Sequence, residues 1–164
     1  MLSSVDNLEE QARNILLKLL ERGPKSASEL ASALEKHDIP KEIAAQVIQR
    51  FSEVQLIDDQ AVAEQVVSAS RRTKGLARSM VKRKLADKGL DQQVIDEVAA
   101  GITDEDELKV ATELAIKRLG QLSHFDSETQ KRRLVGFLQR RGFSSSIVFE
   151  AIREAQVQAV KSEF

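Results

Sequence analysis

Three stretches of this chain share one pattern of apolar and turn residues, and this repeat constrains the fold more than any other feature. The second stretch starts 51 residues after the first, and the third starts 53 residues after the second. In each stretch the matching residues lie 0, 4, 8, 9, 13 and 17 positions from its first residue. A fixed period of this size is typical of an array built from one supersecondary unit. We therefore predict a stack of helical modules whose function lies on a shared surface. The equivalent residues are Leu30, Leu34, Asp38, Ile39, Ile43 and Val47; Val81, Leu85, Gly89, Leu90, Val94 and Val98; and Leu134, Leu138, Gly142, Phe143, Ile147 and Ala151.

The spacing of apolar residues favours helices throughout, because they recur three and four positions apart and strict alternation is rare. At offset 8, Gly89 and Gly142 suit the left-handed conformation that ends many helices, and Asp38 takes that place in the first stretch. We predict an all-α fold of three tandem three-helix repeats, helix-turn-helix-like, in an elongated curved array. The expected helices are 8–22, 26–37, 40–54, 59–72, 75–88, 91–101, 104–122, 127–141 and 144–160. The expected repeats are 1–54, 55–102 and 103–164.

Composition limits the cellular compartments in which the protein is expected. Among its 164 residues there is no cysteine, which excludes disulfides and thiolate metal sites and allows a reducing compartment. The stretch from Met1 to Asn7 lacks the basic and apolar regions of a secretory signal. Nowhere is there an apolar run near the ~20 residues that span a bilayer. We expect a cytoplasmic protein that makes no membrane contact.

Residues that carry chemistry are scattered in this sequence. The seven glycines are dispersed, and His37 and His124 each lack a second imidazole one helical turn away. The adjacent acids Asp58 and Asp59 precede an expected helix, where such residues usually cap it and favour its dipole. The serines at 144–146 read as a capped turn with no base placed to activate a nucleophile. We therefore expect no metal, no cofactor and no enzymatic activity.

The formal net charge of −1 hides a strong segregation of charge along the chain. Residues 51–70 and 89–108 carry acids without bases, whereas 71–88 carries eight bases against one acid. A second basic cluster lies at 131–141. Because local blocks decide which partners are attracted, these cations favour an anionic partner over the alternative of a merely solvated charged face. The candidate partner-binding residues are Arg71, Arg72, Lys74, Arg78, Lys82, Arg83, Lys131, Arg132, Arg133, Arg140 and Arg141.

The arrangement of the first basic cluster depends on one glycine. Arg71, Lys74, Arg78 and Lys82 are spaced by three, four and four, so they would form one stripe on a continuous helix. Gly75 is expected to break that helix. The stripe would then border the interface between modules.

Sequence-specific DNA recognition is disfavoured by the charge of the helix that would read the bases. In a helix-turn-helix unit the second helix of the pair enters the major groove. Here that helix, 91–101, carries Asp91, Asp96 and Glu97 and no base, so phosphates would repel it. Weak, salt-sensitive phosphate contact by the other helix stays possible. A helix-turn-helix transcription factor and a helical scaffold for some other protein are the alternative functions.

Several short motifs resemble those of the RecX family. The resemblance covers nearly the whole chain, because the plan of three repeats of three helices in about 160 residues also matches. Departures from the family pattern are Val62, Val66 and Val67, which stand where the family usually has aromatic residues. The motifs are Leu56-Ile57-Asp58-Asp59 with Ala63-Glu64, then Ser70-Arg71-Arg72 with Gly75, then Leu85-Ala86-Asp87-Lys88-Gly89-Leu90.

The resemblance implies a function. Members of the RecX family regulate the bacterial RecA recombinase by binding its nucleoprotein filament along the groove. They inhibit its ATP hydrolysis, strand exchange and coprotease activities, and so modulate DNA repair and the SOS response. For this chain the resemblance implies a cytoplasmic regulator with the RecA filament as partner. The bases at 71–88 would then contact acidic recombinase surface or the enclosed DNA, and the acids at 91–107 would meet a basic recombinase surface. We further expect a monomer with at most weak non-specific contact with DNA.

Overall fold

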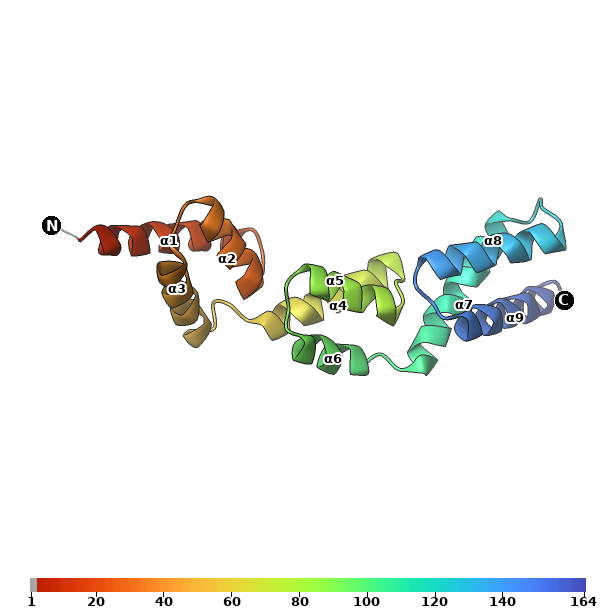
Figure 1. The fold of residues 1–164 in the computed structure, drawn as a ribbon. Helices are drawn as coiled ribbons and strands as arrows, with labels where there is room; N and C mark the ends of the chain where they lie inside the picture. The colour runs from red at the N-terminus through yellow and green to blue at the C-terminus, as the bar shows by residue number, and fades with distance from the viewer. Residues whose placement is uncertain (1–2) are drawn as a thin grey trace. The chain divides into compact units, whose positions relative to one another are not determined.

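The computed structural model describes residues 3–164, and these form nine helices and no strand (Figure 1). The all-α prediction is confirmed, and each expected helix is present. The helices are α1 (Ser4–Glu21), α2 (Ala27–Lys36), α3 (Lys41–Glu53), α4 (Asp59–Lys74), α5 (Arg78–Asp87), α6 (Gln92–Ala100), α7 (Asp104–Gln121), α8 (Ser127–Arg140) and α9 (Ser145–Ser162).

Two helices begin at other residues than the spacing of apolar residues predicts. Helix α1 begins four residues earlier than predicted, because Ser3 and Asp6 form a capping box in which each side chain bonds the other's backbone N–H. Helix α5 begins at Arg78 instead of residue 75. Gly75 has a φ of +57° and ends α4, as expected, and the next two residues are buried in the loop.

The chain divides into two compact units, each with its own packing. The first comprises the residues up to Val66 together with Lys84–Ile95. Its core joins the apolar faces of α1, α2 and α3, which all pack on one another. The fully buried side chains there include Leu16, Leu30 and Leu34. The predicted apolar positions of the first repeat thus lie in a core.

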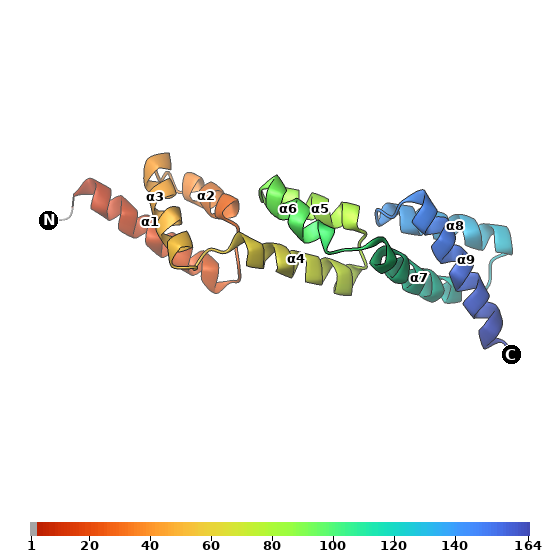
Figure 2. The same ribbon diagram turned by 90° about the horizontal axis from the view of Figure 1, so that it is seen from below.

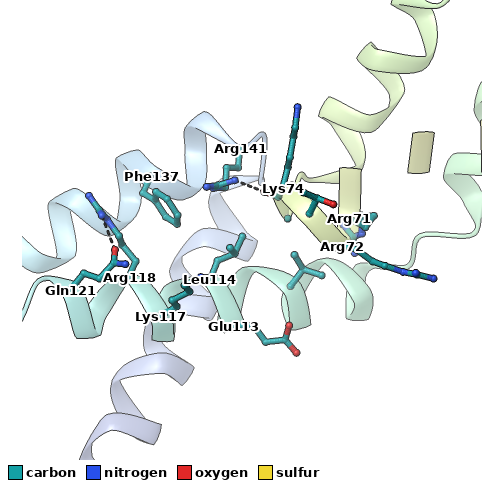
Figure 3. A pocket seen from close by; sticks show the side chains of 13 residues that line it. Arg71, Arg72, Lys74, Glu113, Leu114, Lys117, Arg118, Gln121, Phe137 and Arg141 are labelled. Carbon is teal, nitrogen blue, oxygen red and sulfur yellow. Dashed lines mark hydrogen bonds between the residues drawn. The ribbon is translucent and has the colours of Figure 1, made fainter. Parts of the chain in front are cut away.

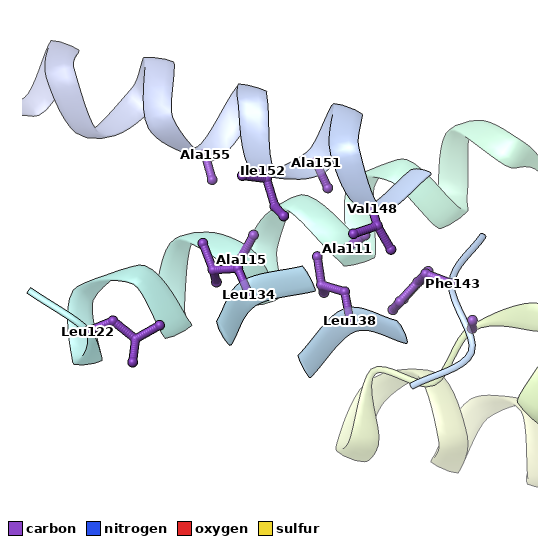
Figure 4. Close-up of a cluster of buried hydrophobic side chains, with 11 residues drawn as sticks. Ala111, Ala115, Leu122, Leu134, Leu138, Phe143, Val148, Ala151, Ile152 and Ala155 are labelled. Atoms are coloured by element: carbon purple, nitrogen blue, oxygen red, sulfur yellow. The ribbon is translucent and has the colours of Figure 1, made fainter. Parts of the chain in front are cut away.

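The second unit, Val67–Arg83 with Asp96–Phe164, is held together mainly by α7, α8 and α9 (Figure 2). Small residues on α7 and α9 let these two helices pack against each other over much of their length. Figure 4 shows Leu134 and Leu138 of α8 filling the space beside Ala111 and Ala115 of α7. All four are 0% exposed, so the apolar positions of the third repeat also form a core.

In both units a hydrogen bond to a backbone carbonyl links consecutive repeats. In the first unit the hydroxyl of Ser26, before α2, donates to the carbonyl of Lys88 at 2.6 Å. In the second unit the N–H of Ala77, before α5, donates to the carbonyl of Arg141 at 3.0 Å. The Ser79 hydroxyl adds a bond of 2.7 Å to the Gly142 carbonyl. The start of one repeat's second helix therefore rests on the turn that ends the second helix of the next repeat.

Glycine at the turns at 89 and 142 suits the backbone conformation and is required by a close approach. Gly89 and Gly142 have φ of +73° and +94°, in the left-handed region expected from the sequence. Asp38 adopts φ +59°, so the conformation alone does not require glycine. The close approach does: a Cβ at Gly89 would lie 2.2 Å from the Ser28 hydroxyl oxygen, and one at Gly142 would lie 2.5 Å from Cγ of Met80.

Side-chain caps define most of the helix starts. Ser26, Thr103, Asp126 and Ser144 each accept a hydrogen bond from the N–H three residues later. The predicted cap at Asp58 is also present, since its carboxylate accepts from the N–H of Ala61 at 3.2 Å. These bonds satisfy N–H groups that have no partner inside the helix.

The cap at Asp126 predicts how stability changes in acid. Hydrogen bonds from Thr129 hold the pKa of the Asp126 carboxyl below its usual value near 3.8. The stability that the charged carboxyl contributes is present above that value and is lost as the pH falls through the lowered pKa. Asp126→Asn keeps a capping oxygen but does not titrate. We expect the wild-type chain to exceed this variant in urea midpoint at pH 6 and to lose that advantage by about pH 2. A constant difference between the two midpoints across this range would contradict the prediction.

Candidate functional site: a basic pocket

A buried ion pair organises the place where α4, α5 and α7 meet. Glu107 near the start of α7 accepts from the guanidinium of Arg71 at 2.5 Å and from the backbone N–H of Arg78 at 2.9 Å. The side chains of Arg71 and Glu107 are only 14% and 8% exposed. Arg71 also donates to the carbonyl of Leu76 at 3.1 Å. The pair thus fixes the loop between α4 and α5 and acts as a remote cap for α5.

Two more cations of the first basic cluster pair with acids of the same unit. Arg78 donates to the Ile102 carbonyl at 2.6 Å and to the Asp104 carboxylate at 2.8 Å. Lys82 lies 3.5 Å from the carboxylate of Asp96. The acids at 91–107 that we expected to meet a basic partner surface therefore include three that neutralise the chain's own cations. The alternation of charge along the sequence serves, at these positions, to join helices.

Beside this ion pair lies a cavity of about 530 Å³ whose lining is strongly basic (Figure 3). Its walls come from the C-terminal end of α4, one face of α7 and the end of α8. Six cations and one acid line it, around an apolar floor. The cations are Arg71, Arg72, Lys74, Lys117, Arg118 and Arg141; the acid is Glu113; the apolar side chains are Val110, Leu114 and Phe137.

Two arginines of the pocket are held in place by the Phe137 ring. The guanidinium carbons of Arg141 and Arg118 lie 4.6 Å and 5.5 Å from the ring centroid, distances at which cations are attracted to the ring. Figure 3 shows the ring between the two side chains. Arg141 also donates to the carbonyl of Lys74, and Arg118 donates to the side-chain oxygen of Gln121 at 2.9 Å. These two guanidinium groups therefore have fixed positions in the pocket wall.

The pocket keeps a net positive charge after its structural partners are counted. Glu113 offsets one cation and Glu107 offsets Arg71. The C-terminal ends of α4 and α8, each equivalent to roughly −0.5 of a unit charge, offset about one more. About three positive charges remain on this estimate. Arg72, Lys74 and Lys117 are exposed at the rim, where they are accessible to an anionic ligand.

The structure brings together only part of the predicted site. From the two basic clusters, Arg71, Arg72, Lys74 and Arg141 line the pocket. Arg78 and Lys82 lie on α5, beyond the break at Gly75, and are bound to acids. Exposed residues outside the pocket are Arg83 on α5 and Lys131, Arg132 and Arg140 on α8. Arg133 lies 4.1 Å over the ring of Phe125.

Sequence reasoning missed the residues that α7 contributes. Glu113, Lys117 and Gln121 lie four residues apart and Leu114 and Arg118 follow the same spacing, so they share one face of α7. That spacing was a usable signal. A short mixed-charge stretch does not stand out beside a block of eight bases, and an i, i+4 row on a helix usually faces solvent.

Two other properties of the described residues bear on the site. Between residues 3 and 164, no three acidic or histidine side chains gather in a way that suits a metal ion. In the same range no helix has both the length and the apolar character needed to cross a membrane.

Family models match the chain in three consecutive segments. The RecX first three-helix domain matches residues 12–51, the second matches 58–98 and the third matches 104–152. The chain belongs to the RecX family. The motifs that carry the resemblance have structural roles here: the RecX motif residue Asp59 accepts from the N–H of Ala27 at 2.9 Å, and Gly89 lies in the first junction between repeats.

Relatives in the RecX family cover most of the chain. A protein of Streptomyces coelicolor named regulatory protein RecX is 38% identical over 146 residues, which is 89% of this chain and 78% of that protein. A protein of the same name from Thermobifida fusca is 32% identical over 97% of this chain and 86% of its own length. These relatives are named as regulatory proteins.

A solved structure supports the fold. The crystal structure of RecX from Lactobacillus salivarius superposes with a TM-score of 0.83 at 22% identity, covering 92% of this chain and 98% of that one. At this identity the likeness shows the fold alone. The fold predicted as tandem three-helix units is thus that of the RecX family.

Proposed function

We propose that this chain binds the RecA recombinase nucleoprotein filament and inhibits its ATP hydrolysis, strand exchange and coprotease activities. The observation that carries the proposal is membership of the RecX family over all three helical domains. The basic pocket supports it, because a protein that acts by binding needs an accessible charged surface. The regulator would act in the cytoplasm as a monomer, without catalysis of its own and with only weak, salt-sensitive DNA contact.

The repeats 1–54, 55–102 and 103–164 are proposed as the units of this binding surface. The three family matches at 12–51, 58–98 and 104–152 each fall inside one of them. Consecutive repeats are joined by hydrogen bonds at the glycine turns, where the Ser26 hydroxyl donates to the Lys88 carbonyl and the Ser79 hydroxyl donates to the Gly142 carbonyl. A chain of similar modules suits a partner that is itself a polymer.

Titration into RecA, single-stranded DNA and ATP tests the proposal. We expect the rate of ATP hydrolysis to fall as the chain is added, and strand exchange to fall in parallel. Weak binding to the same DNA without RecA should disappear as salt is raised. An unchanged rate of hydrolysis with the chain in excess over RecA would reject the proposed function.

The residues that contact the filament are proposed to be the accessible cations of the pocket. Arg71 and Arg78 are unsuitable targets for charge reversal, because their loss would disturb the fold. Arg72→Glu with Lys117→Glu reverses two exposed cations at the pocket rim. We expect the concentration for half-inhibition of RecA to rise about tenfold or more, since close charge pairs at an interface are worth about 1.5 kcal/mol or more.

A matched variant distinguishes an effect of the pocket cations from an effect of the net charge of the protein. Lys131→Glu with Arg132→Glu makes the same change in net charge on exposed residues of α8 outside the pocket. We expect inhibition by this variant to stay within about threefold of wild type, a shift that long-range screened charges can produce. Equal losses in the two variants would remove the pocket from the binding site. Circular dichroism should show the same helicity for both.

A further inference from the structure

We propose that the basic pocket takes an acidic peptide segment carrying one hydrophobic side chain, rather than the phosphate backbone of DNA. The inference deepens the proposed function, on which it rests, by naming the chemistry of the partner surface. Three features of the pocket carry it: the charge at its rim, its apolar floor, and the contact of two arginines with its aromatic ring.

The rim selects anions. Arg72, Lys74 and Lys117 are exposed around the opening, and no hydrogen bond or ion pair engages their side chains within residues 3–164. They can therefore turn toward carboxylates without breaking an internal bond. Behind them, Arg118 and Arg141 are fixed by Gln121 and by the Lys74 carbonyl. Fixed guanidinium groups lose little side-chain freedom on binding, which favours recognition of carboxylates.

The floor selects an apolar group. Val110, Leu114 and Phe137 line the pocket, and each is partly buried rather than fully covered. Leu114 is packed against Gly75, where an added Cβ would lie 2.9 Å from a Leu114 methyl carbon. The floor is therefore fixed by the α4–α5 loop. A cavity of about 530 Å³ has room for a leucine-sized side chain together with its flanking residues, within the range of ordinary ligand pockets.

The aromatic ring disfavours a nucleic acid. Sites for single strands combine a basic groove with rings on which bases stack. The guanidinium carbons of Arg118 and Arg141 lie 5.5 Å and 4.6 Å from the centroid of the Phe137 ring, so two cations of the pocket already contact this ring (Figure 3). Among residues 3–164, Phe137 is the single aromatic residue of the lining. With one ring that two arginines already contact, the pocket offers DNA chiefly the sequence-independent attraction of its charges.

Fluorescence anisotropy with the full chain tests the inference. The probes are a fluorescein-labelled hexapeptide of five Asp and Glu residues with leucine at its third position, the same peptide with serine in place of leucine, and labelled oligo-dT. At about 0.15 M salt, where the Debye length is near 8 Å, we expect the leucine peptide to bind. The serine peptide should bind about tenfold more weakly, because it loses the burial of one apolar side chain.

The two matched variants identify the pocket as the peptide site. Arg72→Glu with Lys117→Glu should weaken binding of the leucine peptide at least tenfold, and Lys131→Glu with Arg132→Glu should change it less than threefold. Oligo-dT should fail to displace the peptide. The inference is overturned if the leucine peptide does not bind, if both peptides bind equally, or if oligo-dT displaces them.

The outcome can be separated from that of the proposed function. Inhibition of RecA that depends on the pocket cations, without binding of the leucine peptide, would reject the acidic segment and retain the regulator. Peptide binding without any effect on RecA would reject the proposed function, and with it the assignment of the acidic segment to RecA.

Discussion

Replacing Glu107 by alanine is expected to lower the free energy of unfolding by about 3–5 kcal/mol, the range for removing one partner of a buried ion pair. The change would leave the Arg71 guanidinium, 14% exposed, without its counter-charge. It would also leave the N–H of Arg78 without its acceptor. Urea unfolding followed by circular dichroism measures the loss. Glu113→Ala, on an exposed side chain of the same helix, should stay within about 0.5 kcal/mol of wild type.

A double-mutant cycle isolates the contribution of the pair itself. Glu107→Gln keeps an oxygen for the Arg78 N–H but removes the charge, and Arg71→Met keeps the apolar stem of the side chain. Each single change leaves one buried charge unpaired, whereas the double variant leaves none. We therefore expect the double variant to cost at least about 1 kcal/mol less than the sum of the two single variants. Additive losses would mean that the two charges do not stabilise each other.

The second large effect is expected at Gly89. Gly89→Ala should destabilise the protein by about 2–4 kcal/mol, combining a left-handed non-glycine residue with steric overlap at a packed contact. The new Cβ would lie 2.2 Å from Oγ and 2.5 Å from Cβ of Ser28. Because the Ser28 Cβ is fixed by its backbone, rotation of the side chain cannot relieve the overlap. The midpoint of urea unfolding is the measurement.

Two further variants separate the causes of that loss. Ser28→Gly in the Gly89→Ala background removes the overlapping atoms, since the next atom, the Ser28 Cα, is 4.0 Å away. We expect partial recovery, leaving the backbone cost of about 1 kcal/mol. Gly120→Ala in α7, where no atom lies within 4 Å of the added Cβ, should raise stability by at most about 1 kcal/mol. Equal destabilisation by Gly89→Ala with and without Ser28→Gly would exclude the steric contact as the cause.

The helices could be predicted from the sequence because their signals are local. The spacing of apolar residues identified every helix, and Gly75, Gly89 and Gly142 marked real left-handed turns. The predicted helix bounds were less accurate where a side-chain cap determines the end of the helix, as the Ser3–Asp6 capping box does at the start of α1. The offsets of the repeat identified core positions such as Leu30 and Leu134, both fully buried.

The candidate site was harder to predict because the order of charged residues in the sequence does not show which charged side chains lie close together in the fold. Blocks of bases suggested a binding surface, yet Arg71 and Arg78 are bound to Glu107 and Asp104. Conversely, Lys117 belongs to the pocket although it lies outside both basic blocks. Pairing of this kind depends on which helices come together, and no local pattern records it.

By itself the sequence determined the helical repeat, the turns between helices and membership of the family, because periodicity and conformational preference act within a few residues. Only the tertiary structure decided which cations are free to bind a partner. It placed Glu107 of α7 against Arg71 of α4, 36 residues away in the chain, and enclosed the pocket between α4, α7 and α8. A buried charge must be neutralised wherever it lies, so packing selects its partner from residues that are distant in sequence.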